Sequence, residues 1–222
     1  MQHGSSTSLD TEANSTSCAF CQHHRIASYI LKETSFFRLV ADHAPLAEGH
    51  LLIIPKEHYT CYGDVPAEFD EELFALKREI RQFFRQFYAP AIFWEHGVFR
   101  QTVFHAHLHC FPFGELAYNL DDALHDQVVA SQGDIRAWYA SQGHYFYMED
   151  AQHGLLFPPQ MDPYLRIIRD VLWTGAAARN GQTTWRSSQQ RQEEGKPMIE
   201  ATVANWRAFQ QQGGDHADQS HT

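Results

Sequence analysis

Three histidines separated by single apolar residues form the stretch His105–His109, and imidazole is a side chain with several chemical uses. The surrounding run from Thr102 to Phe111 is predicted to be a β-strand, in which alternate residues lie on the same face. The three imidazoles would then point to one side, while the residues between them point towards a core. Such a row could transfer protons, attack phosphorus or bind a metal ion.

A second group of residues has the composition of a metal site. Cys18 and Cys21 are separated by two residues, which is half of a common tetrahedral zinc site, and two neutral histidines can complete it. His58 and His105 are the candidates for that role. A Cys-x-x-Cys pair can also be redox-active, but no βαβ pattern surrounds this one. We therefore expect zinc on these four residues.

His107, the central histidine, is the candidate nucleophile. Imidazole is largely unprotonated near neutral pH, and the phosphoramidate that it forms is readily cleaved. With His105 on the metal, His109 would be free to donate to a developing charge or a leaving group. Gln101 and Thr102 add neutral donors suited to phosphate oxygens. The alternative is that all three histidines bind a metal, as in some zinc hydrolases.

Composition limits the class of protein and its partners. The chain has 222 residues, of which 43% are hydrophobic and 14% aromatic, so it can bury a sizeable core. Its formal charge of -10 argues against a nucleic acid polymer or an anionic membrane as partner, but not against a small phosphorylated ligand. The sequence shows no apolar run that could span a bilayer and no hydrophobic segment near its start, so we expect a cytoplasmic protein.

Apolar spacing and turn residues predict an α+β fold with an antiparallel sheet. Pro66 suits the first turn of an amphipathic helix, and Asp64 is its candidate cap. The expected strands are 36–40, 51–54, 91–95, 102–111 and 144–148, and the expected helices are 66–87, 120–140, 163–173 and a short one near 198–210.

The two ends of the chain differ in composition from the rest. Residues 1–17 and 211–222 are polar and are predicted to be disordered tails, because neither can bury enough apolar surface to offset the entropy of ordering.

The segment Gln101–His109 resembles the signature of the histidine triad (HIT) superfamily of nucleotide hydrolases and transferases. Upstream segments agree with it in order and spacing: Cys18–Cys21, Asp42–Pro45 followed by Gly49–His58, and Trp94–Gly97. The chain is thus similar to zinc-binding, bacterial-type members, with an added C-terminal extension. The resemblance implies a HIT-like catalytic domain over residues 18–114, with an antiparallel sheet and flanking helices. Residues 115–210 would form a helical C-terminal extension packed on this domain, and a homodimer is the implied assembly.

The resemblance also implies a role for each matching residue. Asp42 would hold the ribose hydroxyls of a nucleotide, and His107 would attack the α-phosphorus. His109, Gln101 and Thr102 would hold the phosphate oxygens, with His50 in the same hydrogen-bond network. A structural zinc ion would be bound by Cys18, Cys21, His58 and His105.

The predicted function is a nucleotide hydrolase that cleaves a phosphoanhydride or phosphoramidate, for example in a dinucleoside polyphosphate, through a nucleotidyl-histidine. A nucleotidyltransferase or phosphorylase with an acceptor other than water is an alternative. So is a zinc-stabilised nucleotide-binding protein of low activity. In the extension, Arg166, Arg169 and Arg186 could contact distal phosphates.

Overall fold

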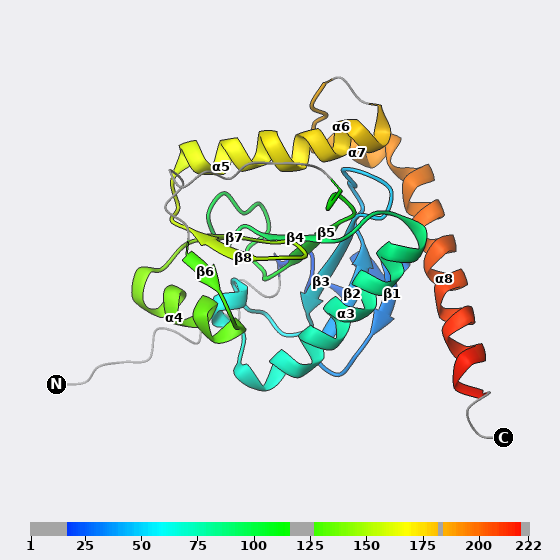
Figure 1. Cartoon of the computed structure of the whole chain (residues 1–222), viewed down its shortest axis with the longest axis horizontal. Helices are drawn as coiled ribbons and strands as arrows, with labels where there is room; N and C mark the ends of the chain where they lie inside the picture. Colours follow the sequence, from blue (N-terminus) through cyan, green and yellow to red (C-terminus); the bar gives the residue numbers. More distant parts are fainter. Residues whose placement is uncertain (1–16, 116–126, 182–183, 219–222) are drawn as a thin grey trace.

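The centre of the molecule is one antiparallel sheet of eight strands (Figure 1). The computed structural model describes residues 17–115, 127–181 and 184–218. The strands follow the order β1-β2-β3-β5-β4-β7-β8-β6. Their bounds are β1 Ile30–Glu33, β2 Phe37–Ala41, β3 Leu51–Pro55, β4 Ile92–Glu95, β5 Leu108–Phe111, β6 Gln127–Val129, β7 Phe146–Glu149 and β8 Gly154–Phe157. The predicted α+β class with an antiparallel sheet is confirmed.

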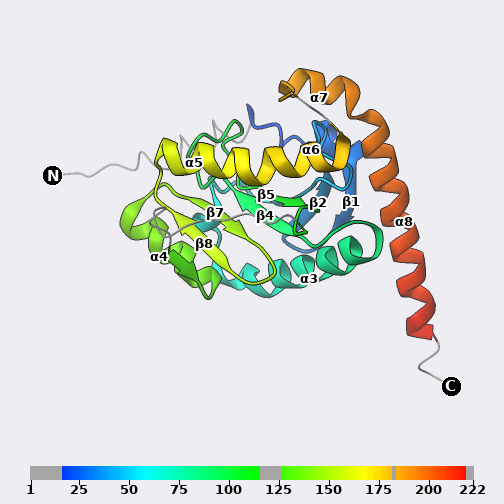
Figure 2. The same ribbon diagram turned by 45° about the horizontal axis from the view of Figure 1, so that its top comes forward.

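Helices pack on both sides of this sheet, with α3 on one side and the run from α5 to α6 on the other (Figures 1 and 2). The helices are α2 His23–Ile26, α3 Asp70–Phe87, α4 Gln132–Gln142, α5 Met161–Ile167, α6 Thr174–Asn180, α7 Ser188–Glu194 and α8 Lys196–Asp218. Shorter turns are η1 Ala27–Tyr29, η2 Tyr62–Asp64, η3 Ala67–Phe69 and the π-helical η5 Ile168–Trp173.

Helix α3 corresponds to the helix expected over 66–87 and covers one face of the sheet. It begins at Asp70, after η3, and three acidic residues in its first turn complement the helix dipole. No side chain caps it, so the expectation that Asp64 is the cap was wrong; that residue lies in η2. Its buried face includes Leu76, Ile80 and Phe84, which join inward-facing residues of β2 to β5 in the largest core cluster.

The opposite face of the sheet carries two separate apolar clusters. Near β2 and β3, the N-terminal segment packs Phe20 and Ile26 against Leu52. Near β4, β5 and β7, the α5 to α6 run packs against Trp94 and Phe111. Because residues alternate along a strand, the residues of β5 that face this side are the ones in register with Phe111. His109 of β5 therefore faces the side of the sheet on which these two clusters lie.

The C-terminal extension contains strands as well as helices. Strand β7 pairs with β4 and continues the sheet through β8 and β6, which makes the extension part of the same sheet. The helix expected over 120–140 was misplaced, since β6 and α4 occupy its second half and 116–126 lie outside the described residues. The helix expected over 163–173 runs from Met161 through η5 to the end of α6.

The strand expected over 102–111 is shorter than predicted, because β5 begins only at Leu108. Its first residue pairs with Ile53 of β3. Upstream of it, the Ala106 N–H donates to the Tyr59 carbonyl, 2.6 Å away, instead of to a neighbouring strand. His105 and His107 therefore lie on an irregular segment that leads into the strand, and only His109 is in the strand itself.

Two further predictions concern the ends of the chain. Most of the predicted N-terminal tail lies outside the described residues, as do residues 219–222. Helix α8 extends to Asp218, past the predicted boundary at 210. Within the described ranges, no helix is long and apolar enough to cross a membrane.

Candidate active site

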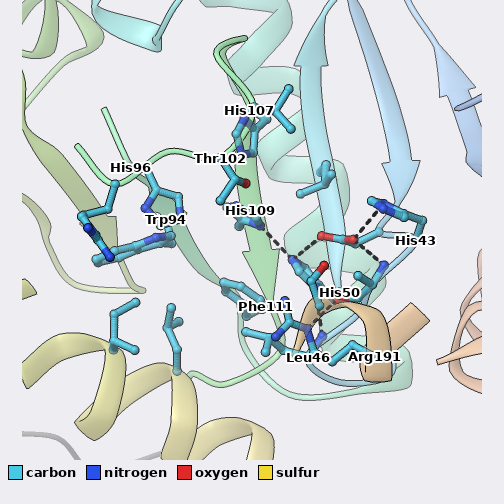
Figure 3. Close-up of a pocket in the computed structure, with 18 of the residues that line it drawn as sticks. His43, Leu46, His50, Trp94, His96, Thr102, His107, His109, Phe111 and Arg191 are labelled. Atoms are coloured by element: carbon cyan, nitrogen blue, oxygen red, sulfur yellow. Dashed lines mark hydrogen bonds and ion pairs between the residues drawn. The ribbon is translucent and has the colours of Figure 1, made fainter. Parts of the chain in front are cut away.

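A cavity of about 290 Å³ lies between the two apolar clusters on the β5 face (Figure 3). This volume is near the lower end of the range for small-molecule sites. The N-terminal segment contributes Phe20 to its wall, and the extension contributes Tyr164 and Arg191. His107 and His109 line it, whereas His105 does not. The three histidines thus face two different sites.

The backbone fixes which nitrogen of His107 is free. Nδ1 lies 2.6 Å from the carbonyl oxygen of His105, and a carbonyl can only accept, so Nδ1 is protonated and donates. Burial lowers the pKa of His107, although the His105 carbonyl and Asp42 oppose this shift, and the ring is neutral at neutral pH. The lone pair of the neutral ring is therefore on Nε2, in a residue that borders the cavity. This is the form of imidazole that can attack phosphorus.

His50 fixes the proton of His109 in a similar way. The N–H of Leu46 donates to Nδ1 of His50 over 3.2 Å, so the neutral His50 ring has its proton on Nε2. That Nε2 lies 2.9 Å from Nδ1 of His109 and donates to it. Burial lowers the pKa of His50 to about 4 and that of His109 well below its ordinary value. His109 is then neutral with its proton on Nε2, ready to donate to an anionic group in the cavity.

Asp42 lies at the end of this hydrogen-bonded row and, among the residues that the structure describes, is the one carboxylate that borders the cavity. Its Oδ2 is 3.4 Å from Nε2 of His50, and its Oδ1 accepts from the Ala44 N–H over 2.7 Å. Burial acts to raise the pKa of Asp42, but His50, the Ala44 N–H and nearby cations outweigh it, so the pKa is lowered. An ionised carboxylate here can accept hydrogen bonds from hydroxyl groups of a ligand.

Gln101 and Thr102 have different positions, although they are adjacent. Thr102 lines the cavity near His107 and His109 (Figure 3). Gln101 is buried outside the cavity lining: its Nε2 donates to the carbonyls of Thr60, Val103 and His105, and its Oε1 accepts from the Val98 N–H. This differs from the expectation that Gln101 holds phosphate oxygens. Its side chain instead braces the loop that leads to the histidines.

That loop has an unusual backbone at its start. Gly97 has φ +52°, and Val98 and Arg100 also have positive φ, which is uncommon for residues with a side chain. A Cβ on Gly97 would lie 2.4 Å from the Tyr145 ring, so only glycine fits there. The loop is thus held between the extension and the Gln101 amide.

The side chains of the four predicted zinc ligands lie close together around His105, outside the cavity lining. Sγ of Cys21 lies 3.2 Å from Nδ1 of His58 and 3.4 Å from Nδ1 of His105, while Sγ of Cys18 lies 3.5 Å from the latter. Ligand atoms on a tetrahedral zinc ion are separated by about 3.5 Å, given Zn–S and Zn–N bonds of about 2.3 and 2.0 Å. Nε2 of His105 donates to the Pro55 carbonyl over 2.9 Å, which leaves the Nδ1 lone pair facing the thiols. The donor set and its spacing fit a tetrahedral ion.

The sequence did not single out several residues that line the cavity. Trp94 and His96 come from the end of β4 and the turn after it, and the Tyr164 hydroxyl lies 3.3 Å from Nδ1 of His96. Burial lowers the pKa of His96 to about 3, so this ring is neutral. Arg191 of α7 also lines the cavity. No periodicity in the sequence indicated that α7 would pack here.

The three arginines expected to contact distal phosphates lie elsewhere. Arg166 and Arg169 lie within ion-pair distance of Asp170, and Arg186 lies 3.0 Å from Glu194. None of these three arginines is among the described residues that line the cavity.

Comparisons with known proteins agree with this fold. A family described as proteins similar to the CwfJ C-terminal region matches residues 7–123, which is more than half of the chain. An adenosine 5'-monophosphoramidase of Saccharomyces cerevisiae, HNT1, is 31% identical over 97 residues, or 43% of this chain and 61% of that protein. The chain therefore spans less than two thirds of that relative.

Two more similar proteins come from bacteria. The HIT-like protein MG132 of Mycoplasma genitalium is 31% identical over 108 residues, or 46% of this chain and 77% of that protein. A zinc-bound histidine triad family protein from Mycobacterium smegmatis is 27% identical and covers 57% of this chain and 95% of its own, with a TM-score of 0.37. The chain belongs to the histidine triad superfamily and, within it, to the family of proteins similar to the CwfJ C-terminal region.

Proposed function

We propose that this protein is a nucleotide hydrolase that cleaves a nucleoside phosphoanhydride or phosphoramidate through a nucleotidyl-histidine. One observation supports this most: His107 is neutral and buried at the cavity, and its Nδ1 proton is directed to the His105 carbonyl, so that Nε2 is left as the nucleophile. The 31% identity to a yeast monophosphoramidase supports the same class of reaction.

The chemistry takes two steps. Nε2 of His107 attacks the α-phosphorus, a P–N bond forms, and the bond to the leaving group breaks with its electron pair on that group. Water then attacks the same phosphorus, the P–N bond breaks with its electron pair on Nε2 of His107, and a nucleoside monophosphate leaves. The proton that the water loses balances the one that the leaving group takes up. Nε2–H of His109 and the hydroxyl of Thr102 stabilise the phosphate oxygens by hydrogen bonds. Asp42 and His50 hold the ribose and orient His109, respectively.

The test compares the wild type with His107→Asn on adenosine 5'-phosphoramidate and diadenosine polyphosphates. We expect loss of turnover by at least about 1,000-fold in the variant, together with loss of an acid-labile nucleotidyl adduct that the wild type forms. His153→Asn, at an exposed position away from the cavity, is the matched control and should retain full activity. Turnover that survives in His107→Asn contradicts the mechanism.

The same intermediate could be passed to an acceptor other than water, which would make the enzyme a nucleotidyltransferase or phosphorylase. Product analysis with inorganic phosphate or a sugar phosphate present separates the two, because hydrolysis yields only the monophosphate. Tight nucleotide binding without turnover would instead support the low-activity nucleotide-binding protein.

We infer that the metal bound by Cys18, Cys21, His58 and His105 is zinc. Four protein ligands leave no open position on a tetrahedral ion, so its role is to link the N-terminal segment to the segment that holds His107. Metal analysis of freshly purified protein should give about one zinc per chain, and Cys18→Ser should lose it. Protein that is fully active and folded without bound metal would contradict this inference.

The expected homodimer and cytoplasmic location stay predictions. Strand β7 pairs with β4, so within the described part of the chain the edge strands of the sheet are β1 and β6, and either could pair with a second copy. Light scattering at several protein concentrations tests the assembly.

A further inference from the structure

The extension contributes one cation to the cavity, and we propose that Arg191 binds a second phosphate group of the substrate, one that His107 does not attack. The proposal rests on the proposed function in that the substrate is a nucleotide. It assigns to the extension a role in choosing between nucleotides with one phosphate and nucleotides with more.

The Arg191 side chain is held in place before any ligand binds. Its Nε donates to the Ala44 carbonyl over 3.0 Å, and its Nη1 donates to the Arg186 carbonyl over 2.8 Å. The Trp185 ring lies against it, with 5.7 Å between the guanidinium carbon and the ring centroid. Nη2 has no partner among the described residues, and the side chain borders the cavity. A guanidinium whose geometry is already fixed loses little entropy when it binds an anion.

Arg191 forms no close ion pair with a carboxylate of the described residues, although Asp42 is near enough to interact with its charge. No carboxylate of the described residues lies within ion-pair distance of Arg191, whereas Arg169 and Arg186 are each paired. The chain has 27 acidic and 17 basic residues, whereas the charged residues that line the cavity, within the described ranges, are Asp42, Arg100 and Arg191. The cavity is thus net positive in an acidic protein, which favours an anionic ligand with more than one charge.

The position of Arg191 separates it from the reacting phosphate. Figure 3 shows His107 at one end of the row of histidines and Arg191 at the other, beyond His50. A phosphate in contact with Nε2 of His107 is therefore not the group that Arg191 meets.

Contacts between the extension and the residues after Asp42 also fix the position of Arg191 relative to Asp42. Gln192 of α7 lies 3.1 Å from the His43 ring, and the Asn180 amide at the end of α6 donates to the Leu46 carbonyl over 2.5 Å. The Thr202 hydroxyl of α8 accepts from the Gly49 N–H over 2.8 Å. Three helices of the extension thus contact residues 43–49, directly after Asp42. The second phosphate would lie on the ribose or further along the 5' phosphate chain.

The experiment measures binding of AMP, ADP and adenosine 3',5'-bisphosphate by calorimetry. All proteins are the full chain with His107→Asn, which prevents turnover. Arg191→Gln removes the charge but keeps an amide donor for the Ala44 carbonyl, and Arg169→Gln removes an exposed arginine of the extension as the matched control. We expect ADP or the bisphosphate to bind at least about 10-fold more tightly than AMP. Arg191→Gln should reduce this ratio to about 2 or less, with AMP binding changed little, and Arg169→Gln should leave the ratio intact.

The ligand that shows the advantage identifies the source of the phosphate. Equal binding of all three ligands, or an advantage that survives in Arg191→Gln, overturns the proposal. If Arg191→Gln fails to fold, Arg191→Lys serves in its place, because lysine keeps the charge without the planar fork of the guanidinium. Its ratio of ADP or bisphosphate affinity to AMP affinity should be intermediate, and a ratio equal to that with Arg191 also overturns the proposal. The outcome is separate from that of the proposed function, because the binding ratio needs no turnover while the His107→Asn assay measures turnover alone.

Discussion

Replacing Glu95 by Gln should remove a pH-dependent loss of stability. Glu95 is buried at the end of β4, where its Oε1 accepts from the Tyr62 N–H over 2.7 Å and its Oε2 contacts the Tyr145 hydroxyl over 2.7 Å. It joins η2 to β4 and to the residue that precedes β7. No cation of the described residues is paired with it. Burial raises its pKa from 4.5 to about 7, although both hydrogen bonds act against the shift.

The sign and size of the effect follow from this shift. Between pH 4.5 and 7 the folded protein holds a proton on Glu95 that the unfolded chain has released, so stability falls as the pH rises through this window. The contribution is fully present below pH 4.5 and lost above pH 7. A shift from 4.5 to about 7 corresponds to about 3 kcal/mol. Gln resembles the protonated carboxyl, so Glu95→Gln should gain about 3 kcal/mol on the wild type between pH 4.5 and 8.

Urea unfolding of both proteins at pH 4.5, 5.5, 6.5 and 8 measures this difference, and titrations shared by both proteins cancel. Glu200→Gln, at an exposed position of α8, is the control and should follow the wild type at every pH. A wild type and Glu95→Gln that keep a constant difference across the range would refute the reasoning, because Glu95 would then titrate alike in the folded and unfolded states.

Three further outcomes are expected. A strong chelator should lower the melting temperature of the wild type but have no further effect on Cys18→Ser, as seen by circular dichroism; a wild type insensitive to full metal removal would contradict the structural role. His50→Leu should lower kcat/KM by about 10- to 100-fold because His109 loses the donor that sets its tautomer, and His50→Gln should restore part of it; equal activity of both variants would count against this. Gly175→Ala should destabilise the protein by about 1–3 kcal/mol, since a Cβ would lie 2.4 Å from the Phe113 ring, and an unchanged urea midpoint would be inconsistent with that packing.

The sequence predicted well where local periodicity decides the structure. The strong apolar spacing of α3 and the short apolar runs of β2, β3 and β4 gave elements close to those observed. It failed for the strand over 102–111, whose alternation is locally that of a strand. The hydrogen-bond partners of that segment are distant in the chain. The Tyr59 carbonyl accepts from the Ala106 N–H, where a longer strand would need a partner in β3. Pairing of β7 with β4 is equally non-local, and no periodicity indicates it.

Residue types and their order along the chain determined the chemistry: three imidazoles beside a Cys-x-x-Cys, with Asp42 and His50 between. Only the tertiary structure decided which nitrogen of each ring is free, because that depends on the His105 and Pro55 carbonyls and the Leu46 N–H. The structure also showed that the Gln101 side chain supports the loop behind the cavity and does not line the cavity. Only the tertiary structure placed the Arg191 guanidinium at the cavity, for the same reason. Hydrogen bonds to main-chain groups far apart in sequence fix this side chain, and a sequence pattern does not give the distances between such groups.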